Sequence, residues 1–410
     1  MFVSHLSLTD FRSYHQVDLT FGPGITAFVG PNGQGKTNLV EAIGYVSTFA
    51  SHRVPSDAPL VRAGASAAVV RSRIVRAQDD GSERALVLDI QLGSGRNNRV
   101  KLNGSPSRSR DVIGALRSVL FAPEDLALVK GDPDGRRKFV DALCVQITPR
   151  LAGVFSEYDR VVRQRTALLK SASAMRGGKP DLSTLDVWDA KLAELAARVI
   201  VARHAVVAAL SPYVAEAYRQ VSDDQGAAEL SYRSSLDAAL SGSNSWEDEA
   251  PVEAGPRPVE AVEAAMLRAL ESVRRKELDR GVCLVGPHRD DLVLTLGGLP
   301  AKGYASHGES WSFALALRLA SYQLLSNGPV DGTVNGEADL WVADSGPDGE
   351  PVLMLDDVFA ELDAKRRQRL ATMVAGARQV FVTAAVPGDV PEQLSGERFD
   401  VLAAEVTRAE

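Results

Sequence analysis

The sequence contains little cysteine and no long apolar run. Cys144 and Cys283 are the only cysteines among 410 residues, and their separation fits neither a disulfide framework nor the close ligand spacing of a zinc site. The longest apolar runs are far shorter than the roughly 20 residues that a membrane-spanning helix needs. The start of the chain, Met1 to His5, lacks the basic and apolar regions of a secretory leader. These absences predict a protein of the reducing cytoplasm without a membrane span.

The chain also lacks an overall excess of basic residues, because its formal net charge is −7. This charge argues against a uniformly basic nucleic-acid-binding protein. The basic residues are unevenly distributed, however, since residues 53–179 hold 23 Lys and Arg against 13 Asp and Glu. A localised polyanion site would produce such asymmetry, and ordinary solvated faces would produce it equally well.

One eight-residue stretch matches the phosphate-binding pattern G-x-x-x-x-G-K-[ST] at every fixed position. It reads Gly30-Pro31-Asn32-Gly33-Gln34-Gly35-Lys36-Thr37. An apolar, β-branched run at 25–29 predicts a buried strand before it, and the residues from Asn38 onward predict a helix after it. Glycines let backbone N–H groups surround phosphates at the positive end of that helix. Lys36 is therefore the candidate phosphate ligand and Thr37 the candidate Mg²⁺ ligand.

A second candidate segment lies near the other end of the chain. Residues 352–355 are an apolar strand candidate, and Asp356 and Asp357 follow directly. In a nucleotide site the first carboxylate holds Mg²⁺ through water, and the second orients the attacking water. An ordinary strand followed by an Asp-rich helix cap is the competing interpretation. If the two segments share one site, the chain between them must leave the core and return.

Ser306 and Gly308 stand before a strongly predicted helix at 309–325. Ser and Gly at a helix N-terminus form either a plain cap or a phosphate-facing element. The position between a glycine loop and an acidic strand end favours a signature motif that meets the γ-phosphate of a nucleotide on a partner subunit.

The predicted fold is α/β: an ATPase head that combines a parallel core sheet with an antiparallel β-subdomain. We assign residues 1–148 and 282–410 to the head, and 149–281 to an inserted helical hairpin. An arginine-rich antiparallel meander is expected at 67–75, 84–92 and 98–102, because turn signals separate these runs. Apolar residues from Trp188 to Val206 recur at four- and three-residue steps, as in a coiled-coil seam.

Two further segments are predicted to be loops. Residues 237–258 are acidic and rich in Ser, Gly and Pro, and residues 327–350 are rich in Gly, Asp and Asn.

These motifs, in this order, resemble the ABC/SMC ATPase superfamily and most closely its RecF family. The resemblance covers nearly the whole chain. It rests on residues 8–14, 30–38, 51–53, 121–126, 131–137, 286–291 and 355–363. The segments Gly-Pro-His-Arg-Asp-Asp and Asp-Asp-Val-Phe-Ala-Glu-Leu-Asp are highly specific in that combination.

The resemblance implies an ATP-dependent DNA-binding protein that forms a homodimer on ATP. Such a protein recognises duplex DNA beside single-stranded gaps and, with the mediators RecO and RecR, promotes loading of RecA. ATP and Mg²⁺ are the implied cofactors, and hydrolysis is expected to be weak and DNA-dependent.

Residue by residue, the resemblance assigns Lys36, Asp356 and Asp357 to catalysis, with Thr37 and Asp356 at the metal. Asp357 occupies the place of a catalytic Glu and is one methylene shorter, which predicts slow hydrolysis. Ser306 and Gly308 become the signature that acts in trans.

The resemblance also places Asn38, Arg12 and Arg53 near the nucleotide. For the two arginines, the alternative is that they are ordinary surface residues. Thr383 lies where transporter ATPases carry a switch His. The chain departs from the family pattern at Trp311, which occupies the place of a basic residue after the signature.

The DNA candidates are basic residues of the meander and of the segment behind it. They are Arg96, Arg99, Lys101, Arg108, Arg110, Arg136, Arg137 and Lys138. Contacts from one basic face are mainly to phosphates, but any single member also fits a solvated surface residue, and Arg136 and Arg137 also fit buried partners of acids.

Three alternative functions make different demands on the sequence. A transporter subunit would place its acidic and glycine motifs closer together and would not need the arginine-rich meander. A small-molecule kinase or GTPase is the second alternative, but the sequence lacks the guanine motif Asn-Lys-x-Asp. A clamp that uses ATP only to hold a dimer together is compatible with every motif.

Overall fold

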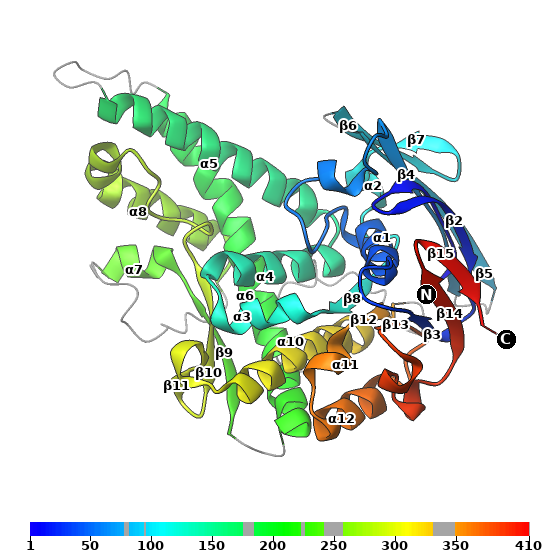
Figure 1. The fold of residues 1–410 in the computed structure, drawn as a ribbon. Helices are drawn as coiled ribbons and strands as arrows, with labels where there is room; N and C mark the ends of the chain where they lie inside the picture. Colours follow the sequence, from blue (N-terminus) through cyan, green and yellow to red (C-terminus); the bar gives the residue numbers. More distant parts are fainter. Residues whose placement is uncertain are drawn as a thin grey trace.

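The computed structural model describes residues 1–77, 82–93, 96–174, 184–222, 226–241, 257–330 and 349–409. Two six-stranded sheets stand beside each other at one end of the molecule, and α1 (Lys36–Thr48) lies between them and contacts strands of both (Figure 1). Long helices extend away from the sheets at the other end (Figure 1).

The core sheet has the strand order β15-β14-β3-β13-β12-β8, and it is parallel except for its last hairpin. Its strands are β3 (Gly24–Val29), β8 (Ser118–Phe121), β12 (Val352–Asp356), β13 (Gln379–Ala384), β14 (Glu397–Leu402) and β15 (Glu405–Arg408). Every residue of β12 and β13 is buried, as expected for parallel strands covered on both faces. This confirms the predicted core sheet from both chain ends. The sequence reading missed β14, although Phe399 and Val401 alternate with less buried residues.

The second sheet is antiparallel, in the order β2-β1-β4-β5-β6-β7. Its strands are β1 (Phe2–Phe11), β2 (Tyr14–Thr20), β4 (Ala67–Ala77), β5 (Glu83–Gly93), β6 (Arg96–Leu102) and β7 (Ser105–Ser107). Alternate residues such as Leu88 and Ile90 are buried, and the opposite face carries polar side chains. The predicted meander is thereby confirmed. All of these strands come from the N-terminal end of the chain.

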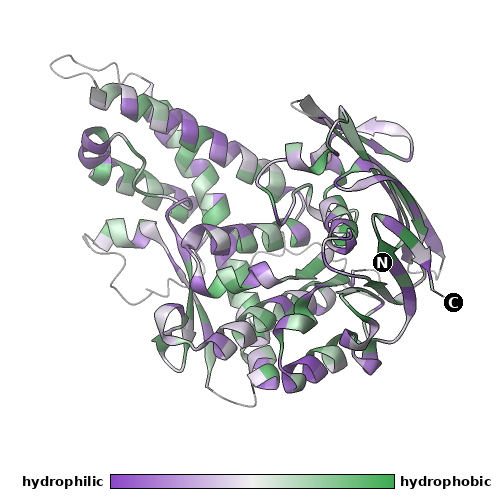
Figure 2. Cartoon of the chain, in the orientation of Figure 1, coloured by the Kyte–Doolittle hydropathy of each residue, from purple (hydrophilic) through white to green (hydrophobic). Residues whose placement is uncertain are grey.

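Three long helices form an arm: α5 (Leu151–Ala174), α6 (Leu185–Ser222) and α8 (Val259–Arg280). The first two are the predicted pair, and α8 packs against both, so the arm has three helices instead of a simple hairpin. Hydrophobic and hydrophilic residues alternate along these helices (Figure 2). The 38-residue α6 also packs against α10 (His307–Asn327) in the head.

A strand pair crosses the predicted end of the inserted segment at residue 281. β9 (Ala228–Arg233) lies inside that segment and pairs with β10 (Asp291–Leu296) beyond it. One cluster of buried apolar residues also includes members of α5, α6, α8, α10 and the core sheet. The domain boundaries stay a prediction. β9 was missed, although Ala228, Leu230 and Tyr232 alternate as buried residues.

The remaining described elements are short, apart from two helices beside the core. The helices are α2 (Ser109–Val112), α3 (Leu126–Lys130), α4 (Pro133–Ile147), α7 (Ser235–Ser241), α9 (Ala301–Tyr304), α11 (Val358–Glu361) and α12 (Ala364–Val374), and β11 (Leu299–Pro300) pairs with β10.

The predicted loop at 237–258 is wrong at its start, because α7 covers 237–241; residues 242–256 lie outside the described part, as do 331–348 of the other predicted loop. Both cysteines are free and buried. None of the helices in the described residues is long and apolar enough to cross a membrane.

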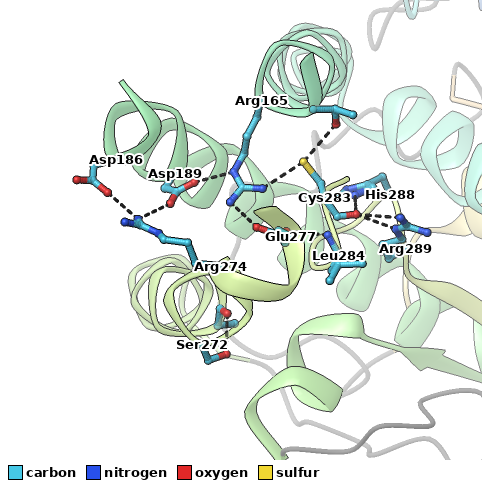
Figure 3. A network of polar contacts seen from close by, with 12 residues as sticks. Arg165, Asp186, Asp189, Ser272, Arg274, Glu277, Cys283, Leu284, His288 and Arg289 are labelled. Carbon is cyan, nitrogen blue, oxygen red and sulfur yellow. Dashed lines mark hydrogen bonds and ion pairs between the residues drawn. The ribbon is translucent and has the colours of Figure 1, made fainter. Parts of the chain in front are cut away.

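A buried ion cluster joins the three arm helices (Figure 3). Arg165 on α5 is fully buried and donates from Nε to Asp189 Oδ1 of α6 at 2.6 Å, and from Nη2 to Glu277 Oε2 of α8 at 2.6 Å. Its Nη1 contacts Cys283 Sγ at 3.2 Å. Arg274 holds the second oxygen of Asp189 at 2.8 Å. Each buried charge therefore has opposite charge beside it, as burial requires.

Replacing Arg165 by Met is expected to destabilise the arm strongly, because Glu277 then keeps a buried carboxylate without its cation. We expect a loss of about 3–5 kcal/mol in the free energy of unfolding, as for other half-removed buried pairs. Urea unfolding followed by circular dichroism measures it. The control is Arg160→Met on the same helix, whose exposed pair with Glu157 is worth roughly 0.5 kcal/mol. Equal losses in the two variants would contradict the prediction.

Candidate nucleotide site

The glycine loop connects β3 to α1, as predicted. Gly33 and Gly35 have φ values of 79° and 117°, which glycine adopts without strain. Gly30 has a different reason to be glycine, because a Cβ there would lie 2.0 Å from the carbonyl oxygen of Val401 on β14. The core sheet thus fixes the start of the loop by direct contact with its backbone.

The turn between β14 and β15 holds the middle of the same loop. The Ala403 N–H donates to Gln34 Oε1 at 2.7 Å, and the Ala404 N–H donates to the Gln34 carbonyl at 3.1 Å. Both alanines have positive φ, so the turn is shaped to present its N–H groups to Gln34. Sequence reasoning missed this support, because the residues lie far apart in the chain.

Lys36 points back across the loop. Its Nζ donates to the carbonyl oxygens of Gly30 at 2.6 Å and Pro31 at 3.0 Å. Burial lowers the pKa of Lys36, and the negative charges of Asp357 and Asp356 oppose this. The ammonium group is therefore placed inside the curve of the loop, beside both carboxylates.

Asp356 is the point where the two sequence motifs meet. Thr37 Oγ1 donates to Asp356 Oδ1 at 3.0 Å across 319 positions of sequence, and Thr383 Oγ1 donates to the same oxygen at 2.8 Å. Burial raises the pKa of Asp356, while these two hydrogen bonds lower it. The Thr37 hydroxyl and the Asp356 carboxylate are hard oxygen donors side by side, a set that suits Mg²⁺.

Asp357 leaves the strand in an unusual conformation. Its φ is 53°, in the left-handed region, and its N–H donates to Thr383 Oγ1 at 2.9 Å. Burial raises the pKa of Asp357, and Lys36 opposes the shift. The positive charge of Lys36 therefore acts on the Asp357 carboxylate. Thr383, predicted from the position of a switch His, links both acids.

Arg12 and Arg53 converge on a residue that sequence reasoning missed. Glu41, on α1 one turn beyond Thr37, is fully buried and accepts hydrogen bonds from Arg12 Nε at 2.8 Å and Nη2 at 2.6 Å. Ser51 donates to it at 2.5 Å, and Arg53 Nη1 lies 3.7 Å away. Burial alone would raise the pKa of Glu41, but the hydrogen bonds from Arg12 and Ser51 leave it lowered. The signal available in the sequence was an acid among the apolar positions of α1.

Asn38 connects this acid-centred cluster to the loop. Its Oδ1 accepts from Arg53 Nη1 at 3.2 Å, and its Nδ2 donates to Ser13 Oγ at 2.9 Å. His52 lies near Asp356, Glu41 and Glu124, whose charges act on it, and burial lowers its pKa. Arg53 therefore contacts Asn38, which directly follows the glycine loop, and Arg12 is tied to α1 through Glu41; their roles toward a nucleotide remain predictions.

Ser306 and Gly308 lie elsewhere, at the start of α10. Ser306 accepts the Glu309 N–H at 3.2 Å, and Glu309 accepts the Ser306 N–H at 2.7 Å, which completes a capping box. Among the described residues, no hydrogen bond joins either residue to the glycine loop. The structure thus brings Lys36, Thr37, Asp356 and Asp357 together and leaves the predicted signature on a separate element.

Among the DNA candidates, Arg136 is buried and Arg137 is partly buried. Arg136 is 7% exposed in its side chain and forms two 2.8 Å hydrogen bonds with Asp291. Arg137 Nη1 donates to the Asp290 carbonyl at 2.9 Å. The DNA prediction for Arg136 is wrong, because a buried ion pair with Asp291 engages its guanidinium group; for Arg137, which is partly exposed, it stays a prediction.

Five of the other DNA candidates lie at the surface. Arg99 and Lys101 are exposed on the outer face of β6, and Arg108 and Arg110 are exposed beyond it. Lys138 is exposed and pairs with Asp134 at 2.6 Å. Arg96 begins β6, and its side chain lies outside the described part of the structure.

The family model for the RecF/RecN/SMC N terminal domain matches residues 2–393. The chain is 57% identical over 414 residues to the DNA replication and repair protein RecF of Beutenbergia cavernae, with all of both chains covered. The chain belongs to the RecF family. It is also 58% identical over 403 residues to RecF of Kineococcus radiotolerans, covering 98% of this chain and 97% of that one.

The fold is likewise that of a solved RecF. The structure of the recombination mediator protein RecF-ATP in the RecFOR pathway superposes with a TM-score of 0.80 at 25% identity, covering 100% of this chain and 97% of the other. The predicted ABC/SMC-like ATPase head is confirmed by this likeness and by the family match.

Replacing Gly30 by Ala is expected to abolish measurable ATP binding, because the new methyl group cannot coexist with the Val401 carbonyl at 2.0 Å. Either the loop or β14 must then move. Fluorescence titration with a labelled ATP analogue measures the affinity. Gly22→Ala is the matched control, since a Cβ there meets no described atom within 4 Å. Unchanged affinity in Gly30→Ala would show that β14 does not constrain the loop.

Proposed function

We propose that this chain is an ATP-dependent DNA-binding protein of recombinational gap repair, in which ATP and Mg²⁺ drive dimerisation on DNA. The observation that carries the proposal is the convergence of Lys36, Thr37 and Asp356 at one edge of the core sheet. The RecF names of the relatives and the ATP of the related structure support it.

In this proposal each residue of the site has a chemical role. Lys36 exchanges the Gly30 and Pro31 carbonyls for β- and γ-phosphate oxygens, and backbone N–H groups of the loop donate to the remaining oxygens. Thr37 and Asp356 hold Mg²⁺, which neutralises phosphate charge. Asp357 orients the attacking water, and Thr383 holds the Asp356 carboxylate and the backbone N–H of Asp357. Because Asp357 is shorter than a Glu, turnover is slow, and the enzyme is a weak, DNA-dependent ATPase.

The separate signature indicates why ATP would act as a switch. Ser306 and Gly308 begin a 21-residue helix that makes no described hydrogen bond with its own glycine loop. In a head-to-head pair, each signature faces the γ-phosphate bound by the other subunit. ATP then joins two heads, and hydrolysis releases them. RecO and RecR are the expected partners at the gap, and RecA loading is the expected outcome.

The DNA surface in this proposal is the outer face of the antiparallel sheet. Arg71 and Arg73 on β4 and Arg99 and Lys101 on β6 are exposed there, on the side opposite the buried residues. Asp89 pairs with Arg71 and offsets one of these charges. The face suits contacts to phosphates, which are independent of sequence.

ATP should convert the wild-type monomer into a dimer, and Lys36→Arg should dimerise at least about tenfold less well, since an ammonium of fixed position is replaced by a bulkier cation. Light scattering with and without ATP measures the mass.

Asp357→Asn should keep the ATP-bound dimer longer than wild type, because binding remains while water activation is lost. If the wild-type mass does not change when ATP is added, the proposal that ATP drives dimerisation is contradicted. If the dimer of Asp357→Asn lasts no longer than that of wild type, ATP holds the dimer together without being hydrolysed.

The double variant Arg99→Gln/Lys101→Gln should bind duplex DNA more weakly and with a shallower salt dependence. Losing two phosphate contacts reduces the slope of log K against log salt by about 1.8. Fluorescence anisotropy at several salt concentrations, with ATP present, measures it. Arg160→Gln on the arm removes one exposed arginine away from this face and serves as the control. An unchanged slope in the double variant would exclude this face.

A further inference from the structure

The place after the signature, which the family pattern gives to a basic residue, holds no surface side chain in this protein. Trp311 on α10 is 4% exposed and packs within the main apolar core. It can neither carry charge nor reach a ligand beyond the protein surface. The signature turn must therefore obtain any positive charge from another element.

Arg366 on α12 lies directly against the signature glycine. A Cβ added to Gly308 would be 3.1 Å from Arg366 Nη2 and 3.4 Å from Nη1. The guanidinium group therefore rests on the backbone at Gly308, and only a residue without a Cβ leaves it undisturbed.

Two hydrogen bonds fix Arg366 in this place. Its Nε donates to Ser312 Oγ at 2.9 Å, and its Nη1 pairs with Asp363, the residue that caps α12. Ser312 Oγ in turn donates to the Gly308 carbonyl at 3.0 Å. The side chain keeps 25% of its surface exposed, so the group is held without being enclosed.

Among the described residues, the other charged groups near this turn already have hydrogen-bond or ion-pair partners. Glu309 is engaged in the capping box with Ser306, and the Arg366 charge acts on it. Lys130 Nζ lies 3.3 Å from His307 Nδ1 on the neighbouring side. Asp363 is the acid paired with Arg366 and is half exposed. A cation is thus built onto a helix start whose first N–H groups already favour an anion.

We propose that Arg366 is a positioning residue of the signature turn, holding over Gly308 the positive charge that Trp311 does not supply. The inference rests on the proposed ATP-driven dimerisation, in which this turn meets the partner's nucleotide phosphates. Arg366 then contributes to dimerisation of the two ATPase heads and does not contribute to ATP binding by its own subunit.

The position of α12 adds a second consequence. The helix begins shortly after Asp356 and Asp357 in sequence, and Arg366 extends from it to α10. One side chain therefore joins the segment that follows the metal-site acid to the element that faces the other subunit.

The test compares two affinities in each variant. Binding of a fluorescent ATP analogue to dilute monomer reports the subunit's own site, and light scattering over a concentration series with ATP reports dimerisation. Arg366→Gln is expected to weaken dimerisation at least about tenfold and to leave monomer affinity within about twofold. Arg366→Lys keeps the charge and is expected to retain dimerisation within about threefold. Raising the salt concentration should narrow the difference between wild type and Arg366→Gln.

Two further variants secure the interpretation. Lys365→Gln removes a charge from an exposed neighbour on the same helix and is expected to behave as wild type. Gly308→Ala leaves Arg366 in the chain but requires its guanidinium group to shift by a few tenths of an ångström, and should weaken dimerisation in the same direction, though less, even where Arg366→Gln folds poorly. If wild type dimerises with ATP and Arg366→Gln dimerises equally well, this inference is overturned and the proposed function is not. Wild type that ignores ATP would overturn the proposed function and this inference with it.

Discussion

The structure depends on a single carboxylate oxygen, Asp356 Oδ1, and on the strand register that places it. Asp356 pairs with Thr383 across β12 and β13, and β13 in turn pairs with β3, which leads into the glycine loop. Because parallel strands end at one edge, residues from both ends of the chain meet there. Two threonine hydroxyls satisfy the buried oxygen. The long excursion between the motifs must return to this register for the site to exist.

Buried arginine–carboxylate pairs recur away from that edge. Arg165 joins the arm helices, Arg136 binds Asp291, and Arg203 binds Asp141 at 2.7 Å. Two of these pairs change how the positive charge of residues 53–179 is interpreted, because Arg136 and Arg165 belong to that segment. Some of its arginines neutralise acids from the acidic remainder of the chain, inside the protein. Its excess of positive charge is therefore partly structural, and the surface available to a polyanion is smaller than composition indicates.

The long helix α6 gives the arm a direct connection to the head. It packs with α5 and α8 in the arm and with α10 in the head. At its end, Arg369 of α12 donates to the Val221 carbonyl at 3.0 Å, and Tyr218 packs against Phe313. The helix α10 thus contacts α6 of the arm, and Arg366 of α12 donates to Ser312 on it. A movement of the arm relative to the head would have to be accommodated at this helix.

The sequence by itself determined the local features: the glycine loop, the acidic doublet, the meander and the long helices. Each is encoded within a few consecutive residues by periodicity, turn residues or fixed spacing. Only the tertiary structure decided which side chains meet. It put Arg136 inside the protein, set Val401 against Gly30, and laid Arg366 over Gly308. Such contacts join residues far apart in the chain, and no local pattern specifies a partner that folding alone brings near.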